Sequence, residues 1–164
     1  MPRSKRKTAK ELVDELERDP IYRKRRAARD SATDKRAVEA VLDEAGLVRE
    51  LGATGVHVDS VYDFVNDVIT PLRAVPVLLR HLELPHIPAI REGLFRSLAY
   101  SHLRSSALDH LKAHFQATVE PGERWLVPNA IAAMATLKEV ADLPGVTEYA
   151  NLFKHTSRKQ RGKR

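Results

Sequence analysis

Two histidines spaced four residues apart come nearest, in this chain, to a metal site. His110 and His114 would share one face of a helix, and two imidazoles at that spacing can bind zinc. In the zinc-protease helix a glutamate follows the first histidine, but Leu111 holds that position here. Further ligands would have to come from other histidines: His81, His86 and His102. We therefore predict surface or hydrogen-bonded histidines, with no metal and no other cofactor.

Several serines close to His102 raise the question of nucleophilic catalysis. They are Ser97, Ser101, Ser105 and Ser106. A hydrolase serine sits on a strained turn from strand to helix, whereas these serines stand near expected helix ends, where serine is a frequent cap. The carboxylates Glu120 and Glu123 fall in an expected loop, and the seven glycines are too scattered for a phosphate-binding loop. We expect no enzymatic activity.

The composition indicates a single helical core. Hydrophobic residues make up 43% of the 164 residues, enough for one substantial core, while aromatic residues make up only 5%. There is no cysteine, which excludes disulfides and thiolate chemistry and is typical of a reducing compartment. No apolar run approaches the roughly 20 residues of a membrane span, so we predict a soluble cytoplasmic protein.

The net charge of +6 is unevenly distributed along the chain. Residues 1–36 hold 13 Lys and Arg against 7 Asp and Glu, and residues 154–164 hold 6 against none. Residues 37–153 hold 9 against 15, so the middle is acidic and both ends are basic. We predict disordered basic tails at 1–7 and 154–164 around one helical domain at 8–153.

The basic ends favour nucleic-acid binding as an alternative function. Lys and Arg that neutralise phosphates give affinity for nucleic acid without reading its sequence. The candidate residues are Arg23, Lys24, Arg25, Arg26, Arg29, Arg158, Lys159 and Arg161. Two other interpretations stay open: the ends keep the protein in solution, or they fold back on the acidic middle.

Helical patterns begin near the N-terminus. Thr8 and Glu11 have capping-box spacing, which predicts a helix over 9–18 that ends at Asp19-Pro20. A strongly patterned helix over 34–51 should follow, weakened at Gly46 and terminated by Gly52 in a left-handed conformation. Its expected core face consists of Val38, Val41, Leu42, Ala45, Val48 and Leu51.

The rest of the chain predicts more helices and essentially no sheet. Asp59 or Ser60 should cap a short helix that carries Val61, Phe64, Val65 and Val68. Longer helices are expected at 71–82, 89–102, 107–115 and 125–137, with a last one between 139 and 153. Ser105 or Ser106 should cap the third of these.

An internal repeat connects the helices of the second half. Val75, Leu78 and Leu82 correspond to Leu108, Leu111 and Phe115 at an offset of 33 residues. At an offset of 36, Leu94, Phe95, Leu98 and Ala99 correspond to Ala130, Ile131, Met134 and Ala135. Two helices per repeat of this length are typical of an α-solenoid. The predicted fold class is therefore all-α, a short right-handed solenoid of antiparallel helix pairs.

These repeats resemble bacterial HEAT repeats over about residues 38–142. The segment from Ala74 to Leu82 has an early proline in the first helix, and Ile90-Arg91 opens the second helix with an apolar-Arg pair. The second repeat departs from the pattern, because Leu126-Val127 stands in place of that pair. The resemblance implies stacked helix pairs, no assigned activity, and a structural role for Arg91 in binding a neighbouring turn.

A solenoid of this kind predicts a non-enzymatic scaffold that binds a macromolecule, most simply a protein, on its concave face. The candidate contact residues are Arg91, Arg96, Arg124 and Asn129. Trp125 is either an exposed anchor for the partner or, more often at such a position, the end of the core. A third interpretation is an immunity-type inhibitor of a basic toxin, because the segment from Glu39 to Asp67 holds 7 acidic residues and one basic residue.

Overall fold

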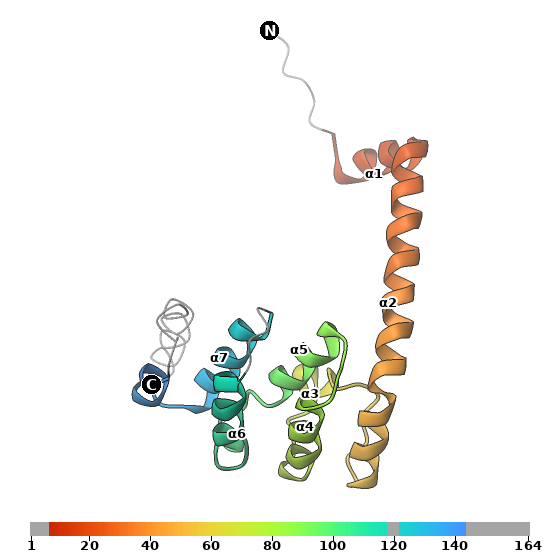
Figure 1. Cartoon of the computed structure of the whole chain (residues 1–164). Helices are drawn as coiled ribbons and strands as arrows, with labels where there is room; N and C mark the ends of the chain where they lie inside the picture. Colours follow the sequence, from red (N-terminus) through yellow and green to blue (C-terminus); the bar gives the residue numbers. More distant parts are fainter. Residues whose placement is uncertain (1–6, 118–121, 144–164) are drawn as a thin grey trace. The chain divides into compact units, whose positions relative to one another are not determined.

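The computed structural model describes residues 7–117 and 122–143. Within these ranges every regular element is a helix and no strand forms, which confirms the all-α class (Figure 1). By their contacts, residues 1–39 form one unit and residues 40–164 form a second. The predicted tail at 154–164 and the first six residues lie outside the described part.

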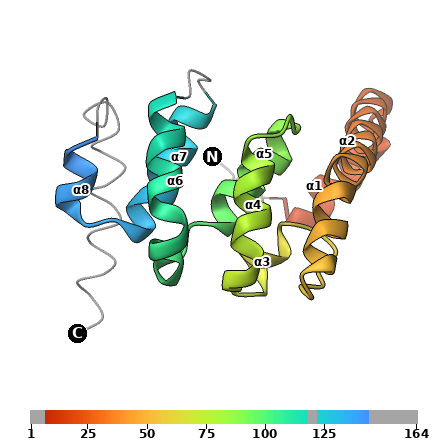
Figure 2. The same cartoon turned by 60° about the horizontal axis from the view of Figure 1, so that its bottom comes forward.

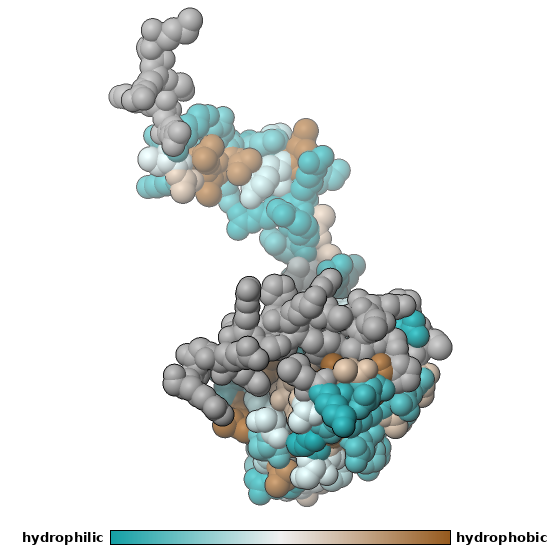
Figure 3. Space-filling model, turned by 90° about the vertical axis from the view of Figure 1, so that its left-hand side faces the viewer, coloured by the Kyte–Doolittle hydropathy of each residue, from teal (hydrophilic) through white to brown (hydrophobic). Residues whose placement is uncertain are grey.

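The first unit contains α1 (Ala9–Arg18) and the beginning of α2 (Pro20–Ala53). The predicted capping box is present, since the Thr8 hydroxyl accepts from the Glu11 N–H and the Glu11 carboxylate accepts from the Thr8 N–H. None of the described residues 7–39 is buried. Figure 3 accordingly shows brown side chains among the teal ones of this unit, and Leu12, Val13 and Leu16 of α1 are each about half exposed.

The helix predicted at 34–51 is the second half of the longer α2, and its predicted C-terminus is wrong. Gly46 lies inside the helix, which runs on to Ala53. The residue with a left-handed conformation is Gly55, at φ 76°, instead of Gly52. The N–H groups of Thr54 and Val56 both reach back to the Leu51 carbonyl and close this end of the helix.

The predicted core face of α2 is confirmed at Leu51, which is buried, and is wrong for its first four residues. Val38, Val41 and Leu42 are 60%, 63% and 72% exposed, and Ala45 is exposed as well. The buried residues of this helix are Glu44, Leu47 and Leu51. On this buried side of the helix, Glu44 accepts hydrogen bonds from the Ser60 hydroxyl and the Val61 N–H.

The second unit arranges its helices in two layers. The end of α2, α4 (Val75–Leu82) and α6 (Arg104–Ala117) lie side by side in one layer (Figures 1 and 2). The other layer contains α3 (Asp63–Asn66), α5 (Pro88–Ser97) and α7 (Glu123–Met134). Two 3₁₀ turns, η1 (Leu72–Ala74) and η2 (Ser101–Leu103), lead into α4 and α6, and α8 (Leu137–Ala141) follows α7.

The residues that correspond in the sequence repeat lie in the core of this unit. Both apolar triplets, one on α4 and the next on α6, are buried: Val75, Leu78, Leu82, Leu108, Leu111 and Phe115. In the second set, Leu94, Phe95, Leu98, Ala130, Ile131 and Met134 are buried, while Ala99 and Ala135 are partly buried. The α4–α5 and α6–α7 pairs therefore use equivalent positions for packing.

Several predicted helix ends differ from the structure. The short helix begins at Asp63 with Tyr62 as its N-cap residue, so Asp59 and Ser60 lie before the cap position. The Ser60 hydroxyl nevertheless accepts from the Tyr62 N–H, and the Asp63 carboxylate accepts from the N–H groups of Asp59 and Ser60. The helix predicted at 89–102 ends at Ser97. Ser105 and Ser106 lie inside α6, and α7 ends at Met134 because Thr136 caps the separate α8.

Candidate functional site

A chain of hydrogen bonds with two histidines at its centre joins α2 to α4. His81, on α4, and His86, in the turn after it, have stacked rings with Nδ1 of His81 2.9 Å from Nε2 of His86. Nδ1 of His86 lies 2.7 Å from Oδ2 of Asp43, and Nε2 of His81 lies 2.9 Å from Oε2 of Glu50. Both imidazoles are 5% exposed. The hydrogen bond with His81 lowers the pKa of Glu50, and the Arg80 guanidinium, which also binds this carboxylate, contributes less.

A second polar cluster joins α5, α6 and α7. Nη1 of Arg91 donates to the carbonyls of Leu82 and Leu84 at 3.1 Å each, and the same guanidinium forms an ion pair with Glu123. Nε2 of His114 lies 3.0 Å from the Glu123 carboxylate. Arg91 thus binds the turn between α4 and α5, the structural contact that the HEAT resemblance implied for it.

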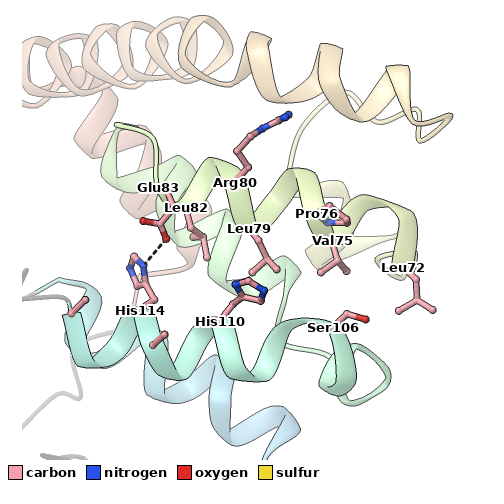
Figure 4. A pocket seen from close by; sticks show the side chains of 12 residues that line it. Leu72, Val75, Pro76, Leu79, Arg80, Leu82, Glu83, Ser106, His110 and His114 are labelled. Carbon is pink, nitrogen blue, oxygen red and sulfur yellow. Dashed lines mark hydrogen bonds and ion pairs between the residues drawn. The ribbon is translucent and has the colours of Figure 1, made fainter.

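The first layer has an open groove between α4 and α6, which we call the α4–α6 groove. It encloses about 680 Å³. Figure 4 shows Leu79 and Leu82 pointing from α4 toward His110 and His114 of α6. The remaining lining residues are Leu72, Val75, Pro76, Arg80, Glu83, Ser106, Ala113 and Ala117. The floor of the groove is apolar and its charged groups lie at the edges.

A second groove, the α5–α7 groove, adjoins the first and encloses about 690 Å³. Glu83, His114 and Ala117 line both grooves, so the two meet at these residues. The Glu83 side chain is 74% exposed there, 3.4 Å from Nδ1 of His114. At the far side Trp125 lines the groove and is 47% exposed, which favours the anchor interpretation over the core.

The four residues predicted to contact a partner all lie on α5 and α7. The donors of Arg91 are engaged within the second unit, as described above. Arg96 is exposed and pairs with Glu92 one turn away, and Arg124 is exposed. Nδ2 of Asn129 donates to the Trp125 carbonyl at 2.8 Å on the same helix. Contact of these residues with a partner stays a prediction.

The predicted nucleic-acid residues fall in two places. Those in the first unit, Arg23, Lys24, Arg25, Arg26 and Arg29, are exposed on α2. Arg158, Lys159 and Arg161 lie outside the described residues.

The other sequence candidates are not brought together in the described ranges. His110 is exposed, His114 binds carboxylates, and no group of three metal-ligating side chains occurs in residues 7–117 and 122–143. Nε2 of His102 lies 2.8 Å from the Thr70 carbonyl, while the Ser97 hydroxyl donates to the Leu94 carbonyl. These contacts are structural and do not form a nucleophile–base pair.

The chain of hydrogen bonds from Asp43 to Glu50 has no signal in the sequence. By residue type alone, His81 and His86 are only possible metal ligands. Asp43 and His86 are 43 residues apart and Glu50 and His81 are 31 apart, so no local spacing signals the network. Only the packing of α2 beside α4 brings the four side chains together.

The fold and the two grooves define a helical protein with an open surface that is apolar at its floor and charged at its edges. In the part of the chain that the structure describes, no helix has both the length and the apolar content to span a membrane. Comparison of the chain with protein-family models, with curated proteins and with solved structures finds no match.

Proposed function

We propose that the chain is a non-enzymatic, HEAT-like binding module that holds a segment of a partner protein in the α4–α6 groove. The observation that supports this proposal is the groove itself, a long hollow between two consecutive helix pairs with an apolar floor. Apolar hollows with a few polar groups at the edge are the usual form of binding sites in proteins.

The chemistry of the groove favours a particular kind of segment. Leu72 and Leu79 offer apolar contact, and Leu72 is 57% exposed. Glu83 presents a largely exposed carboxylate where the two grooves meet. A helical or extended segment with apolar side chains and one Lys or Arg placed to reach Glu83 would match this surface. Trp125, at the far side of the α5–α7 groove, offers a second apolar contact.

The predicted residues Arg96 and Arg124 belong to this proposal as outer contacts. Both are exposed on the layer of α5 and α7. A partner long enough to leave the α4–α6 groove past Glu83 would continue along this layer. The absence of cysteine from the sequence supports a reducing, cytoplasmic setting for the complex.

The experiment is site-specific crosslinking in the native host with a photoreactive residue at the exposed position of His110. We expect one discrete protein adduct. Leu72→Ser and Glu83→Lys should each reduce it, because they remove apolar contact and reverse the charge. The matched control is Leu84→Ser, since Leu84 is 42% exposed and lines neither groove. An adduct that is unchanged by Leu72→Ser and Glu83→Lys would contradict the proposal.

A further inference from the structure

The first half of α2 carries a line of arginines along one face. Arg25, Arg29 and Arg36 are separated by four and seven residues in a continuous helix. With 3.6 residues per turn, the three positions fall within about 40° of one another and extend over about 16 Å. All three side chains are exposed. We call this set the arginine stripe, and it lies entirely in the first unit.

Acidic side chains do not neutralise the arginine stripe. The neighbouring Arg26 pairs with Glu17 and Asp30, but in the described residues no ion pair forms at Arg25, Arg29 or Arg36. Asp30 and Asp34 lie on another face of the helix, about 100° or more from each stripe residue. Glu39, about one turn after Arg36, is exposed and forms no ion pair with it in the described residues. The three guanidinium groups therefore form an open row of positive charge.

The residues around the arginine stripe indicate which kind of partner would bind it. Residues 23–37 contain no Val, Leu, Ile, Met, Phe or Trp. A helix that lies on a membrane needs an apolar face to insert beside its charges, and a helix that binds another protein helix needs apolar anchors. This segment has neither. The exposed Val38, Val41 and Leu42 follow it at about 100° or more from each stripe residue, and a single exposed apolar residue, Ile21, precedes it in α2. A row of unpaired arginines without an apolar face instead suits a row of phosphates, to which guanidinium groups donate in a bidentate manner.

The residue types of this segment also favour binding of a duplex over binding of a single strand. Binding of single strands relies on aromatic side chains that stack with bases, and Tyr22 is the one aromatic residue beside the stripe. An isolated α-helix fits the major groove of a duplex and can contact the phosphates that border it. No Asn or Gln occurs in residues 23–37 to read adenine.

We propose that Arg25, Arg29 and Arg36 form a binding site for the phosphate backbone of double-stranded nucleic acid, independent of its sequence. This site is separate from the grooves of the second unit and does not depend on the proposed protein partner. It assigns the predicted nucleic-acid function to one face of α2.

The test is fluorescence anisotropy of the full chain with two unrelated 20-base-pair duplexes between 50 and 200 mM salt. The stripe variant is R25Q/R29Q/R36Q. The control is R23Q/K24Q/K35Q, which removes the same charge from the same helix at positions about 80° or more from the stripe. Glutamine keeps a helix propensity close to that of arginine and lysine, and circular dichroism checks that helicity is equal in the two variants.

Each phosphate contact contributes about 0.9 to the slope of log affinity against log salt. We expect the slope of the stripe variant to be smaller than that of the wild type by about 2.7. Between 50 and 200 mM salt, the affinity of the wild type should therefore fall by a factor about 40 times larger than the factor for the variant. The control should keep the slope, and both duplexes should bind equally. The proposal would be overturned if both variants lost the same amount of slope, or if neither lost any. It would also be overturned if the chain bound anionic lipid vesicles but not the duplexes.

Discussion

Nδ1 of His81 lies 2.9 Å from Nε2 of His86, and the outer nitrogen of each ring faces a carboxylate. Three hydrogen bonds therefore run from Asp43 through the two imidazoles to Glu50. Each bond needs one hydrogen on a ring nitrogen, and two neutral imidazoles together provide only two. While both carboxylates are ionised and only accept, all three contacts are hydrogen bonds only when the rings bind a third hydrogen.

Nuclear magnetic resonance of ¹⁵N-labelled imidazoles checks this count directly. With Asp43 and Glu50 ionised, we expect the rings of His81 and His86 to hold three nitrogen-bound hydrogens in total, because ionised carboxylates only accept and three contacts need three donated hydrogens. The exposed His110 is an internal reference for an imidazole in contact with water. Two neutral rings with one hydrogen each would contradict the prediction.

Two glycines in helices should respond in opposite directions to the same substitution. A Cβ at Gly93 would lie 2.5 Å from Cγ1 of Val61, so Gly93→Ala should destabilise the protein by about 1–3 kcal/mol through overpacking. A Cβ at Gly46 would meet nothing within 4 Å, so Gly46→Ala should stabilise α2 by about 0.5–1 kcal/mol. Urea unfolding of both variants measures the two free energies. Stabilisation by Gly93→Ala would show that the α3–α5 contact is looser than described.

Glu44 should be important for stability although it is charged. It is 5% exposed, and its carboxylate accepts from the buried N–H of Val61 and the Ser60 hydroxyl. Glu44→Ala leaves the Val61 N–H unpaired, which should cost about 1–3 kcal/mol in the free energy of unfolding. Glu44→Gln keeps an oxygen acceptor and should cost less. The matched control is Glu39→Ala on the exposed part of α2, expected within about 0.5 kcal/mol of the wild type.

Glu139 should link folding stability to pH in acid. Hydrogen bonds from Arg104, and then from Thr136, hold its pKa well below the ordinary 4.5. A carboxyl with a lower pKa in the folded state stabilises the fold above its unfolded pKa, and this contribution disappears as the pH falls toward the folded value. The difference in unfolding free energy between wild type and Glu139→Gln should therefore be greatest near neutral pH and shrink in acid.

The carboxyl titration of Glu139 gives an independent check. Arg104→Gln removes the largest cause of the shift, so the pKa of Glu139 should rise toward its ordinary value while Thr136 still donates to it. An unchanged titration in Arg104→Gln would assign the shift to the remaining donors, the Thr136 cap and Lys112.

The sequence by itself determined the local helical structure. Thr8 and Glu11 act within one turn, and the capping box they predict is present. The same spacing recurs at Thr136 and Glu139, where the capping box begins α8, so the prediction that the preceding helix continues to 137 is wrong. The apolar triplets of α4 and α6 are buried as their repetition indicated, because period alone places such residues on one face.

Only the tertiary structure decided which face of a helix turns inward and which distant polar groups meet. Val38, Val41 and Leu42 have helical spacing with the buried Leu51, yet these three are exposed, and packing buries Glu44 and Leu47 beside Leu51. The histidine pair and its carboxylates are likewise joined only by the contact of α2 with α4 and the turn after it. Helix periodicity and capping act within a few residues, whereas the orientation of a helix against its neighbours depends on contacts between residues 16 to 43 positions apart, which local patterns do not encode.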